Sequence, residues 1–321
     1  MQAKKDNLQI AVVGGGSVGL LYAARLALYG QAVTVVTRRS PQSNQLMQNG
    51  LTLQDLDGQK KVVSVNAQSI EHGLPHAHLY LLGVKQTELP DLLPMLQKLP
   101  AEARVIALQN GLGHEEQLPK VLSERQCFFA INTEGARRLS ATEVAHTGSG
   151  LLRIGPWVKR GVVDPVINSF IAIAISAGMN VQLEESIKPF AWKKLMANSL
   201  INPLTALFDI PNGALLDSPD TLKLMRELFE EASAVAFANG QKMGETDWQE
   251  IVTLCRNTSR NHSSMLQDVK KQKRTEVESI NGYLVSRGKE AGISTPLHEV
   301  LLRLILLKTD MGMEKEGGDI R

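Results

Sequence analysis

A glycine-rich turn between an apolar run and a helical segment limits the folds open to this chain. The β-branched run at residues 8–13 precedes the turn, and residues 20–30 follow it with helical spacing of large apolar side chains. A second β-branched run spans residues 33–37. Strand, glycine turn, helix and strand in this order predict a dinucleotide-binding unit, with the pyrophosphate on free N–H groups at the helix start. The candidate cofactor-binding residues of the turn are Gly14, Gly15, Gly16, Ser17, Val18 and Gly19.

Three of these glycines have separate expected roles. Gly14 permits the tight turn, Gly16 lets a pyrophosphate approach the backbone, and Gly19 lets the helix pack closely on the strand. The alternative is a glycine-rich turn in an α/β protein that binds no dinucleotide.

The residues after the second strand favour NADPH over NADH. An NAD site usually has an acidic residue there, about twenty residues after the glycines, to bind the ribose 2′-hydroxyl. Here Arg38 and Arg39 follow the strand, and no acidic residue occurs between Asp6 and Asp55. Guanidinium groups suit a 2′-phosphate. Arg38 is the better candidate because it is nearer the strand end; the alternative is that both arginines are only solvated.

Two further apolar runs predict buried parallel strands. One run spans residues 79–84 and is followed by Lys85. The other spans residues 104–108 and is followed by Gln109 and Asn110. Ligands of such sheets bind beyond the carboxyl ends of the strands. Lys85 and Asn110 are therefore candidate cofactor or substrate contacts, although polar residues after strands are common.

The distribution of strand signals predicts two domains, which the length of 321 residues also suggests. Short strands continue through residues 127–155, with a hairpin turn expected at 147–150, and a buried helix is expected near 170–178. After about Glu184 only helical periodicity remains. The fold class is α/β: an amino-terminal Rossmann-type NADP-binding domain at 1–184, then an all-helical substrate and catalytic domain at 185–321.

Composition argues against several classes of partner. Lys plus Arg is 35, Asp plus Glu is 33 and aromatic residues are 4%, which disfavours nucleic-acid binding. The longest apolar stretch, 170–179, is too short to cross a membrane, and the first ten residues lack a signal-peptide pattern. Two distant cysteines give no metal motif. We expect a cytoplasmic protein; its long amphipathic helices permit a homodimer but do not require one.

One helical segment carries an unusual polar row. Lys194, Asn198 and Asn202 recur every four residues among apolar neighbours, so they lie on one helix face. Pro203 cannot donate to the carbonyl of Ser199, which leaves that carbonyl free. This row suits a small polyoxygenated ligand; the alternative is a structural polar network between helices.

Ser264 and Glu276 are candidates only if the helix between them breaks. On one straight helix they would be about 18 Å apart along the axis. The Thr275-x-x-Glu278 pattern is a capping box before an apolar run, so we expect a break near residues 273–275 and a new helix from Thr275. Such a break could bring Glu276 back toward Ser264.

The chain resembles the ketopantoate reductase family. The matching motifs span nearly the whole sequence in family order: GxGxxG, the lysine after LLGV, QNG at Asn110, WKKLxxNxxINPLTA, PNG at Asn212, and SSMxQD followed by TExxxING. The two carboxyl-terminal motifs are specific, whereas the glycine motif is not.

The resemblance implies NADPH-dependent reduction of 2-ketopantoate (2-dehydropantoate) to pantoate, a step toward pantothenate and coenzyme A. It implies Lys194 as the catalytic lysine, which would act as general acid, with Glu276 as its functional partner. It implies Lys85 near the nicotinamide. The implied substrate-binding residues are Asn110, Asn198, Asn202, Asn212 and Ser264.

The same motifs are compatible with other functions. A paralogue could reduce another 2-keto acid with the same residues, because the side-chain pocket discriminates between substrates. A non-catalytic NADPH-binding regulator would keep the glycine turn but would not need Lys194 with Glu276. None of the seven histidines lies in a recognisable catalytic motif, which disfavours a hydroxy-acid dehydrogenase with a catalytic histidine.

Overall fold

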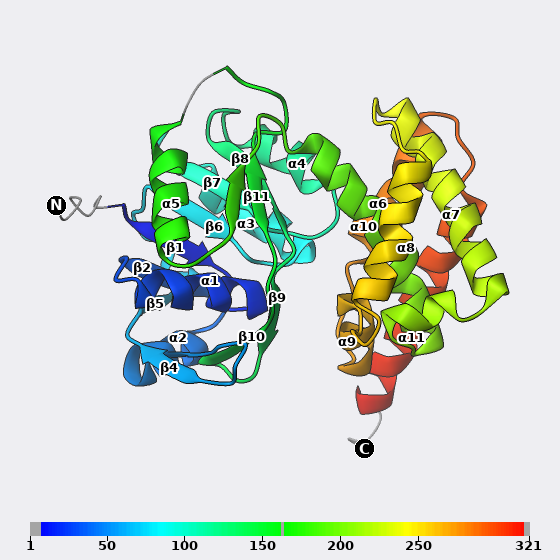
Figure 1. Cartoon of the computed structure of the whole chain (residues 1–321). Helices are drawn as coiled ribbons and strands as arrows, with labels where there is room; N and C mark the ends of the chain where they lie inside the picture. The colour runs from blue at the N-terminus through cyan, green and yellow to red at the C-terminus, as the bar shows by residue number, and fades with distance from the viewer. Residues whose placement is uncertain (1–7, 162–163, 318–321) are drawn as a thin grey trace. The chain divides into compact units, whose positions relative to one another are not determined.

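The computed structural model describes residues 8–161 and 164–317, with side chains up to residue 310. It divides into two compact units (Figure 1). The first holds the chain up to Gln109 together with His114–Lys188, and the second holds Asn110–Gly113 with everything from Pro189 on. The expected fold class is confirmed, since the first unit is a mixed α/β unit with a largely parallel sheet and the second is helical.

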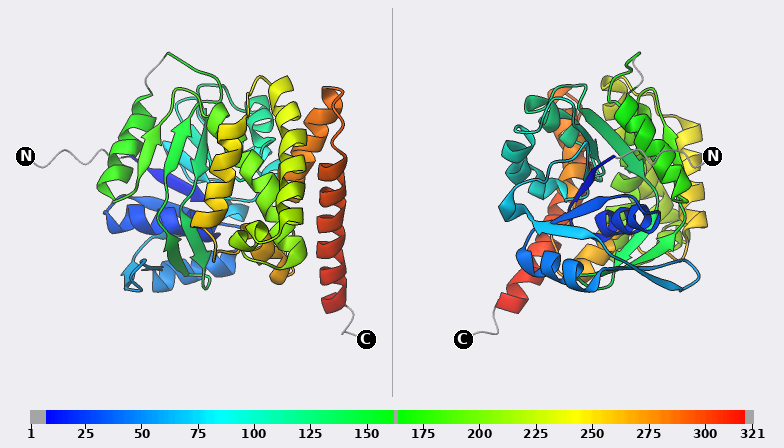
Figure 2. Two further views of the ribbon diagram at one scale, coloured as in Figure 1. Left: turned by 45° about the vertical axis from the view of Figure 1, so that its right-hand side comes forward. Right: turned by 90° about the vertical axis from the view of Figure 1, so that its left-hand side faces the viewer.

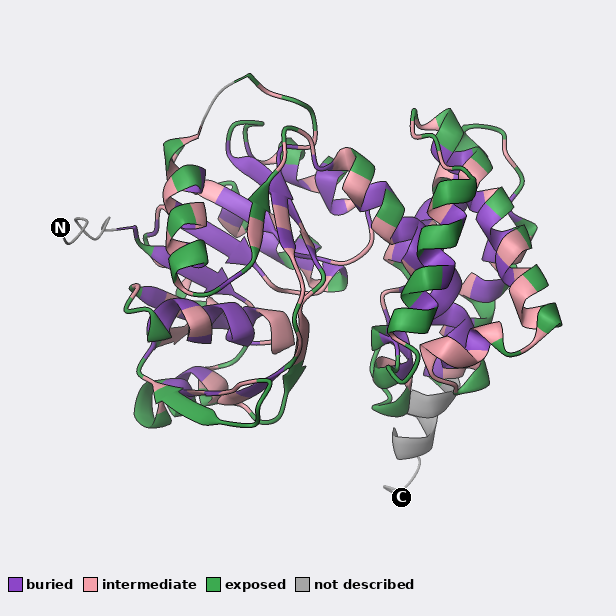
Figure 3. Cartoon of the chain, viewed as in Figure 1, coloured by how far each residue is buried: buried purple, intermediate pink, exposed green. Residues whose placement is uncertain are grey.

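An eight-stranded sheet forms the centre of the first unit. Its strands, in spatial order, are β12 (Val181–Leu183), β11 (Leu152–Gly155), β8 (Cys127–Asn132), β7 (Arg104–Ala107), β6 (Leu79–Leu82), β1 (Ile10–Val13), β2 (Val33–Thr37) and β5 (Asn66–Ser69). The six strands from β8 to β5 are parallel, and β11 runs antiparallel to β8. Figure 3 shows the central strands as buried, as expected for strands covered on both faces.

The register brings the carboxyl ends of three neighbouring strands level. Val13 pairs with Leu82, and Leu82 pairs with Ala107. The glycine turn after β1, the segment before Lys85 and the residues after β7 therefore start at the same edge, where ligands of such sheets bind.

A second sheet contacts α1 (Ser17–Leu28), which also packs on β1 and β2. Its order is β4 (Lys60–Val63), β3 (Leu51–Gln54), β10 (Glu143–Gly148) and β9 (Gly135–Arg138). The hairpin expected at 147–150 is wrong. β10 pairs with β9 and β3, whereas the next strand, β11, belongs to the large sheet. The glycines at 148 and 150 thus lie where the chain passes from β10 of the second sheet to β11 of the large sheet.

Helices complete the first unit: α2 (Ser40–Asn49), α3 (Leu89–Leu96), α4 (His114–Gln117) and α5 (Pro165–Ser176), with 3-10 turns η1 (Ile70–His72), η2 (Gln86–Glu88) and η3 (Leu118–Lys120). The buried helix expected near 170–178 is α5, but only Ile167, Phe170 and Ala174 of it are buried. It covers the sheet with one face and leaves Ile175 exposed.

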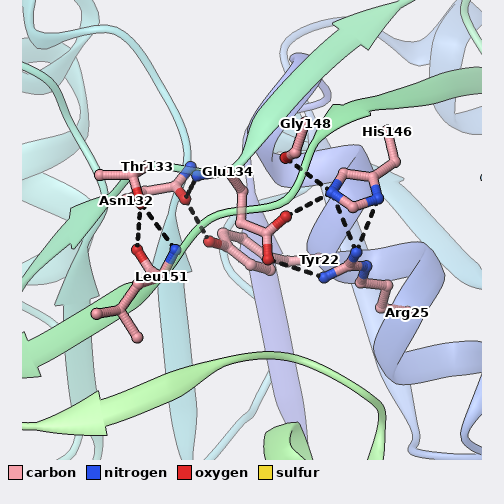
Figure 4. Close-up of polar contacts among 8 residues, drawn as sticks. All are labelled: Tyr22, Arg25, Asn132, Thr133, Glu134, His146, Gly148 and Leu151. Atoms are coloured by element: carbon pink, nitrogen blue, oxygen red, sulfur yellow. Dashed lines mark hydrogen bonds and ion pairs between the residues drawn. The ribbon is translucent and has the colours of Figure 1, made fainter. Parts of the chain in front are cut away.

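A buried polar cluster fixes α1 from the side of the second sheet (Figure 4). Arg25 pairs with Glu134 at 3.1 Å, and the other oxygen of Glu134 lies 2.6 Å from Nε2 of His146. One turn earlier on α1, the hydroxyl of Tyr22 donates to Asn132 at 2.9 Å. The charged partners satisfy one another inside the protein, and the helix that begins at the glycine turn is thereby held in place.

The second unit consists of helices. They are α6 (Lys188–Phe208), η4 (Asn212–Leu216), α7 (Pro219–Ala238), α8 (Glu245–Asn257), α9 (Ser264–Lys270), α10 (Val277–Glu290) and α11 (Pro296–Gly317). The long helix α11, red in Figure 2, packs on α10 and α7. Among the described residues, no helix combines the length and the apolar character that a membrane crossing requires.

The break expected between Ser264 and Glu276 is confirmed. α9 ends at Lys270 and α10 begins at Val277. The predicted start at Thr275 is wrong, because the residue that precedes the first turn is Glu276 and no side chain caps it. Glu278 instead forms an ion pair with Arg274 at 2.7 Å, so the capping box does not form.

Candidate active site

The glycine turn leaves no space for side chains at two of its positions. Gly14 has a φ of +119°, and a Cβ there would lie 2.7 Å from the backbone of Gly83. A Cβ on Gly19 would lie 2.0 Å from the carbonyl oxygen of Gly14. At Gly16, in contrast, the nearest atom would be 3.8 Å away. Gly14 and Gly19 thus pack against backbone atoms, whereas Gly16 has free space beside it. This space fits a pyrophosphate that approaches the backbone at Gly16.

The start of α1 provides backbone donors. The first helical hydrogen bond runs from Leu20 to the carbonyl of Gly16 at 3.0 Å, so the N–H groups of Ser17, Val18 and Gly19 precede it. Gly16 brings no side-chain cap, and the first turn holds no acidic residue. Such a helix end is suited to an anion.

Two residues that the sequence reasoning missed hold this turn. Gln42 and Arg138 donate to the carbonyl oxygen of Gly15 at 2.9 and 3.0 Å. The backbone N–H of Arg138 also donates to the hydroxyl of Ser17 at 3.0 Å. Arg138 comes from β9 of the second sheet, and nothing in its sequence surroundings indicates that this strand reaches the turn.

Arg38 lies at the end of β2 with its side chain 76% exposed, and it pairs with Glu88 at 3.1 Å. An ion pair this exposed contributes little stability, so the guanidinium can turn to a phosphate at small cost. Glu88 also accepts a hydrogen bond from the backbone N–H of Lys85 at 3.3 Å. Arg38 and Lys85 therefore both adjoin Glu88 at this part of the sheet edge.

Gln109, directly after β7, is a third residue that the sequence reasoning passed over. It is 5% exposed, and neither atom of its side-chain amide has a hydrogen-bond partner within the described residues. An unsatisfied buried amide is uncommon. Its position at the carboxyl edge was the available signal.

The structure brings together three of the predicted site residues in the second unit. The ammonium of Lys194 donates to Oδ1 of Asn110 at 2.8 Å, and Nδ2 of Asn110 donates to Glu276 at 3.1 Å. One amide thus bridges a cation on α6 and a carboxylate at the start of α10. An amide can bridge such a pair because it accepts at one end and donates at the other.

A tight turn after β7 delivers Asn110 to this position. Gly111 has a φ of +76°, and a Cβ there would lie 2.4 Å from the carbonyl oxygen of Ser279. The same carbonyl accepts from the N–H of Leu112 at 2.9 Å. Only glycine fits between the turn and α10, and Ser279 is one turn from Glu276.

The environment of Lys194 tunes its proton affinity. Burial lowers the pKa of its ammonium from 10.5 to about 8, and the negative charge of Glu276 opposes that fall. Desolvation disfavours the charged form, whereas an opposite charge favours it. Lys194 is therefore mostly protonated at neutral pH, but far nearer to losing its proton than an exposed lysine.

The polar row on α6 is completed by Asn198 and Asn202. Asn202 is 6% exposed and Asn198 partly so. Within the part of the chain that the structure describes, neither side chain makes a hydrogen bond to protein, so both amides are available to a ligand beside Lys194. The side chain of Ser264 is likewise without a protein partner there and is exposed. The structure gives no hydrogen bond from these three to Lys194 or Glu276.

Asn212 is held by a different segment. Its Nδ2 donates to Thr258 at 3.0 Å, and its backbone N–H donates to the carbonyl of Asn261 at 2.9 Å. Its Oδ1 is buried with no hydrogen-bond partner among the described residues.

A hydrogen bond connects α6 to the residue before Ser264. The hydroxyl of Thr205, near the end of α6, lies 2.7 Å from the hydroxyl of Ser263.

Comparisons with known proteins cover both units. The profile of the family described as "Ketopantoate reductase PanE/ApbA" matches residues 10–159, and "Ketopantoate reductase PanE/ApbA C terminal" matches residues 186–309. The 2-dehydropantoate 2-reductase of Vibrio cholerae is 32% identical, over 93% of this chain and 97% of the relative. That of Bacillus subtilis is also 32% identical, over 89% and 92%.

Solved structures agree with these relatives. A PanE/ApbA family ketopantoate reductase from Ralstonia eutropha is 30% identical, with a TM-score of 0.85 over 95% of this chain and all of that one. A D-mandelate dehydrogenase solved with NADH and anilino(oxo)acetate is 21% identical, with a TM-score of 0.87 over 95% and 99%, and this likeness concerns the fold alone. By sequence over both units and by structure, the chain belongs to the ketopantoate reductase family.

Proposed function

We propose that this protein is an NADPH-dependent oxidoreductase that reduces the ketone of 2-dehydropantoate to the alcohol of pantoate. The observation that carries the proposal is the bridged set of Lys194, Asn110 and Glu276, with the pKa of the lysine lowered to about 8. Relatives at 32% identity over nearly the whole chain are 2-dehydropantoate 2-reductases, and this supports the choice of substrate.

Lys194 is the group that handles the proton. Addition of hydride to a ketone builds negative charge on its oxygen, and a cationic donor aimed at that oxygen lowers the barrier. The nicotinamide, when bound, would supply the hydride. A buried ammonium with a pKa of about 8 is charged at neutral pH yet releases its proton more readily than an exposed one.

The neighbours of Lys194 prepare it and hold the substrate. Asn110 fixes the ammonium through Oδ1, while Glu276 stabilises the charged form of the lysine. Asn198 and Asn202, on the same face of α6, are proposed to bind the substrate hydroxyl, because an amide both donates and accepts. Ser264 is proposed to donate to the substrate carboxylate, and Asn212 to complete the pocket.

The choice of NADPH rests on the end of β2. Arg38 is exposed there with an ion pair that a phosphate can displace, and no acidic residue follows the strand until Asp55. The glycine turn, the donors at the start of α1 and Lys85 complete the proposed cofactor site. The match to the ketopantoate reductase family supports a nicotinamide dinucleotide in general.

The test is the loss of NADPH absorbance at 340 nm with 2-dehydropantoate, beside a panel of other 2-keto acids and phenylglyoxylate, repeated with NADH. We expect turnover with 2-dehydropantoate and NADPH that is at least tenfold higher in kcat/KM than any other pairing. Turnover only with another keto acid would move the protein to a paralogous reductase. Cofactor binding with no turnover would make it a regulator.

A matched pair of lysine variants tests the acid. Lys194→Ala should lower kcat by about 10²- to 10⁴-fold, the usual contribution of a general acid. Lys193→Ala is the control, since that exposed neighbour pairs with Asp247 and Glu250 on α8 and, in the described part of the chain, with no site residue. Wild-type turnover in Lys194→Ala would contradict the assignment.

A further inference from the structure

The carbonyl that Pro203 leaves without its helical partner is bound from another helix. Proline has no N–H, so α6 cannot close the hydrogen bond to the oxygen of Ser199. In the structure that oxygen accepts instead from Nδ2 of Asn281 on α10 at 2.9 Å. Both Ser199 and Asn281 are fully buried. The free carbonyl expected from the sequence is thus a point of attachment between two helices.

The amide of Asn281 is oriented by a buried histidine. Its Nδ2 also lies 3.0 Å from Nδ1 of His298, whose Nε2 lies 3.0 Å from the carbonyl oxygen of Leu228. Because that carbonyl only accepts, the proton of the imidazole is on Nε2 and Nδ1 accepts from Asn281. Burial lowers the pKa of His298 to about 4, which keeps the ring neutral and in this role at working pH.

Asn281 is held through its donors alone. Its Oδ1 is buried and has no hydrogen-bond partner within the described residues. A side chain that leaves its own acceptor unsatisfied while donating to two fixed acceptors has only one good orientation. The chain from Leu228 through His298 and Asn281 to Ser199 therefore links α7, α11, α10 and α6 rigidly.

The hydrogen bond between Asn281 and the Ser199 carbonyl lies equally far along the sequence from both charged groups of the site. Ser199 is five residues after Lys194 on α6, and Asn281 is five residues after Glu276 at the start of α10. Five residues of helix correspond to about 7.5 Å along the axis. A slip of either helix at the Ser199–Asn281 bond would shift Lys194 relative to Glu276 by the same amount.

We propose that Asn281 is a positioning residue: by binding the Ser199 carbonyl it sets the axial register of α6 against α10, and hence the placement of Lys194 relative to Asn110 and Glu276. This inference rests on the proposed function in that it gives Lys194 a chemical task. It differs from a purely structural role, in which Asn281 would only satisfy a buried carbonyl.

Substitution of Pro203 separates these two roles. Pro203→Ala restores a backbone N–H that can donate to the oxygen of Ser199 within α6. In Asn281→Leu the carbonyl loses its partner, and in the double variant Asn281→Leu/Pro203→Ala the helix itself supplies one. The double variant therefore repairs the buried carbonyl without repairing the link between α6 and α10.

We expect Asn281→Leu to lower kcat by about 10- to 100-fold, since small misplacements of reacting groups have effects of that size, with the KM for NADPH within about twofold. In the double variant the urea midpoint should recover in part, because the Ser199 carbonyl regains a donor while Nδ1 of His298 still lacks its own, and kcat should stay low. Recovery of kcat together with stability would overturn the proposal. If Asn281→Leu does not fold, kcat and the urea midpoint are compared between Pro203→Ala and two other variants. These are the double variant and Asn281→Ser, which leaves room for water.

A second readout does not depend on turnover. The pKa of Lys194, measured by NMR of ¹³C-methylated lysines, should move from its wild-type value in Asn281→Leu and in the double variant. Thr309→Val is the control, because among the described residues its buried hydroxyl bonds only to carbonyls of its own helix α11. An unchanged Lys194 pKa in both Asn281 variants would overturn the proposal even if the protein reduced no keto acid, whereas absent turnover with a moved pKa would contradict only the proposed function.

Discussion

The ammonium of Lys194 donates a hydrogen bond to the side-chain oxygen of Asn110 over 2.8 Å, across 84 residues of sequence. Lys194 belongs to the helical unit by sequence, and Asn110 reaches that unit through a four-residue excursion from the end of β7. The excursion depends on Gly111, where a Cβ would collide with Ser279. The position of one glycine thus decides whether the lysine has its partner.

Substitution by alanine should affect stability at one glycine and cofactor binding at another in the glycine turn between β1 and α1. Gly19→Ala places a Cβ 2.0 Å from the carbonyl oxygen of Gly14, so we expect poor folding or a large drop in Tm. Gly16→Ala meets nothing closer than 3.8 Å in the protein and should keep the wild-type Tm while NADPH binding weakens at least tenfold. Thermal unfolding and cofactor titration check both. Unimpaired NADPH binding by Gly16→Ala would place the pyrophosphate elsewhere.

Arg38→Ala should weaken NADPH selectively. The loss of a charge-assisted contact of about 1.5–3 kcal/mol corresponds to roughly a 10- to 100-fold rise in KM for NADPH, with the KM for NADH unchanged. The neighbouring exposed Arg39→Ala is the matched control. Equal effects of the two substitutions, or equal effects on both cofactors, would argue against a 2′-phosphate site at Arg38.

Glu134→Ala should destabilise the first unit. The carboxylate is 4% exposed and pairs with Arg25, which is 13% exposed, so its removal leaves a buried cation unpaired, at about 3–5 kcal/mol. Urea unfolding measures the change. The double variant Arg25→Met/Glu134→Leu should lose less than Glu134→Ala, because no charge is left unpaired. A loss below 1 kcal/mol for Glu134→Ala would mean that solvent reaches the cluster.

Local signals predicted most of the fold because they depend on short stretches. The spacing at residues 33–37 gave β2 with its bounds, and the break before Glu276 was predicted from the Thr275-x-x-Glu278 pattern, although the helix starts two residues later. The predicted hairpin at 147–150 failed because glycines mark a turn without stating which sheet the next strand joins. The capping box at Thr275 failed because Glu278 pairs with Arg274 instead.

Contacts between distant segments could not be predicted in the same way. The polar row of Lys194, Asn198 and Asn202 followed from helical spacing, but the bridge through Asn110 needed the turn at Gly111. Arg138 reaches the glycine turn from β9 only because the second sheet contacts α1. These placements arise from packing of whole elements, for which one sequence carries no local pattern.

The pH dependence of kcat/KM for 2-dehydropantoate between pH 6 and 10, in the wild type and in Glu276→Gln, tests the roles of Lys194 and Glu276 most directly. Lys194 must be protonated to act as the acid, and burial sets its pKa to about 8. The rate should therefore fall tenfold per pH unit above about pH 8. Because the charge of Glu276 raises this pKa, its removal should move the fall to lower pH by about 1 unit or more. A rate that stays level to pH 10, or a fall that is unmoved in Glu276→Gln, would contradict the assignment of Lys194 and Glu276.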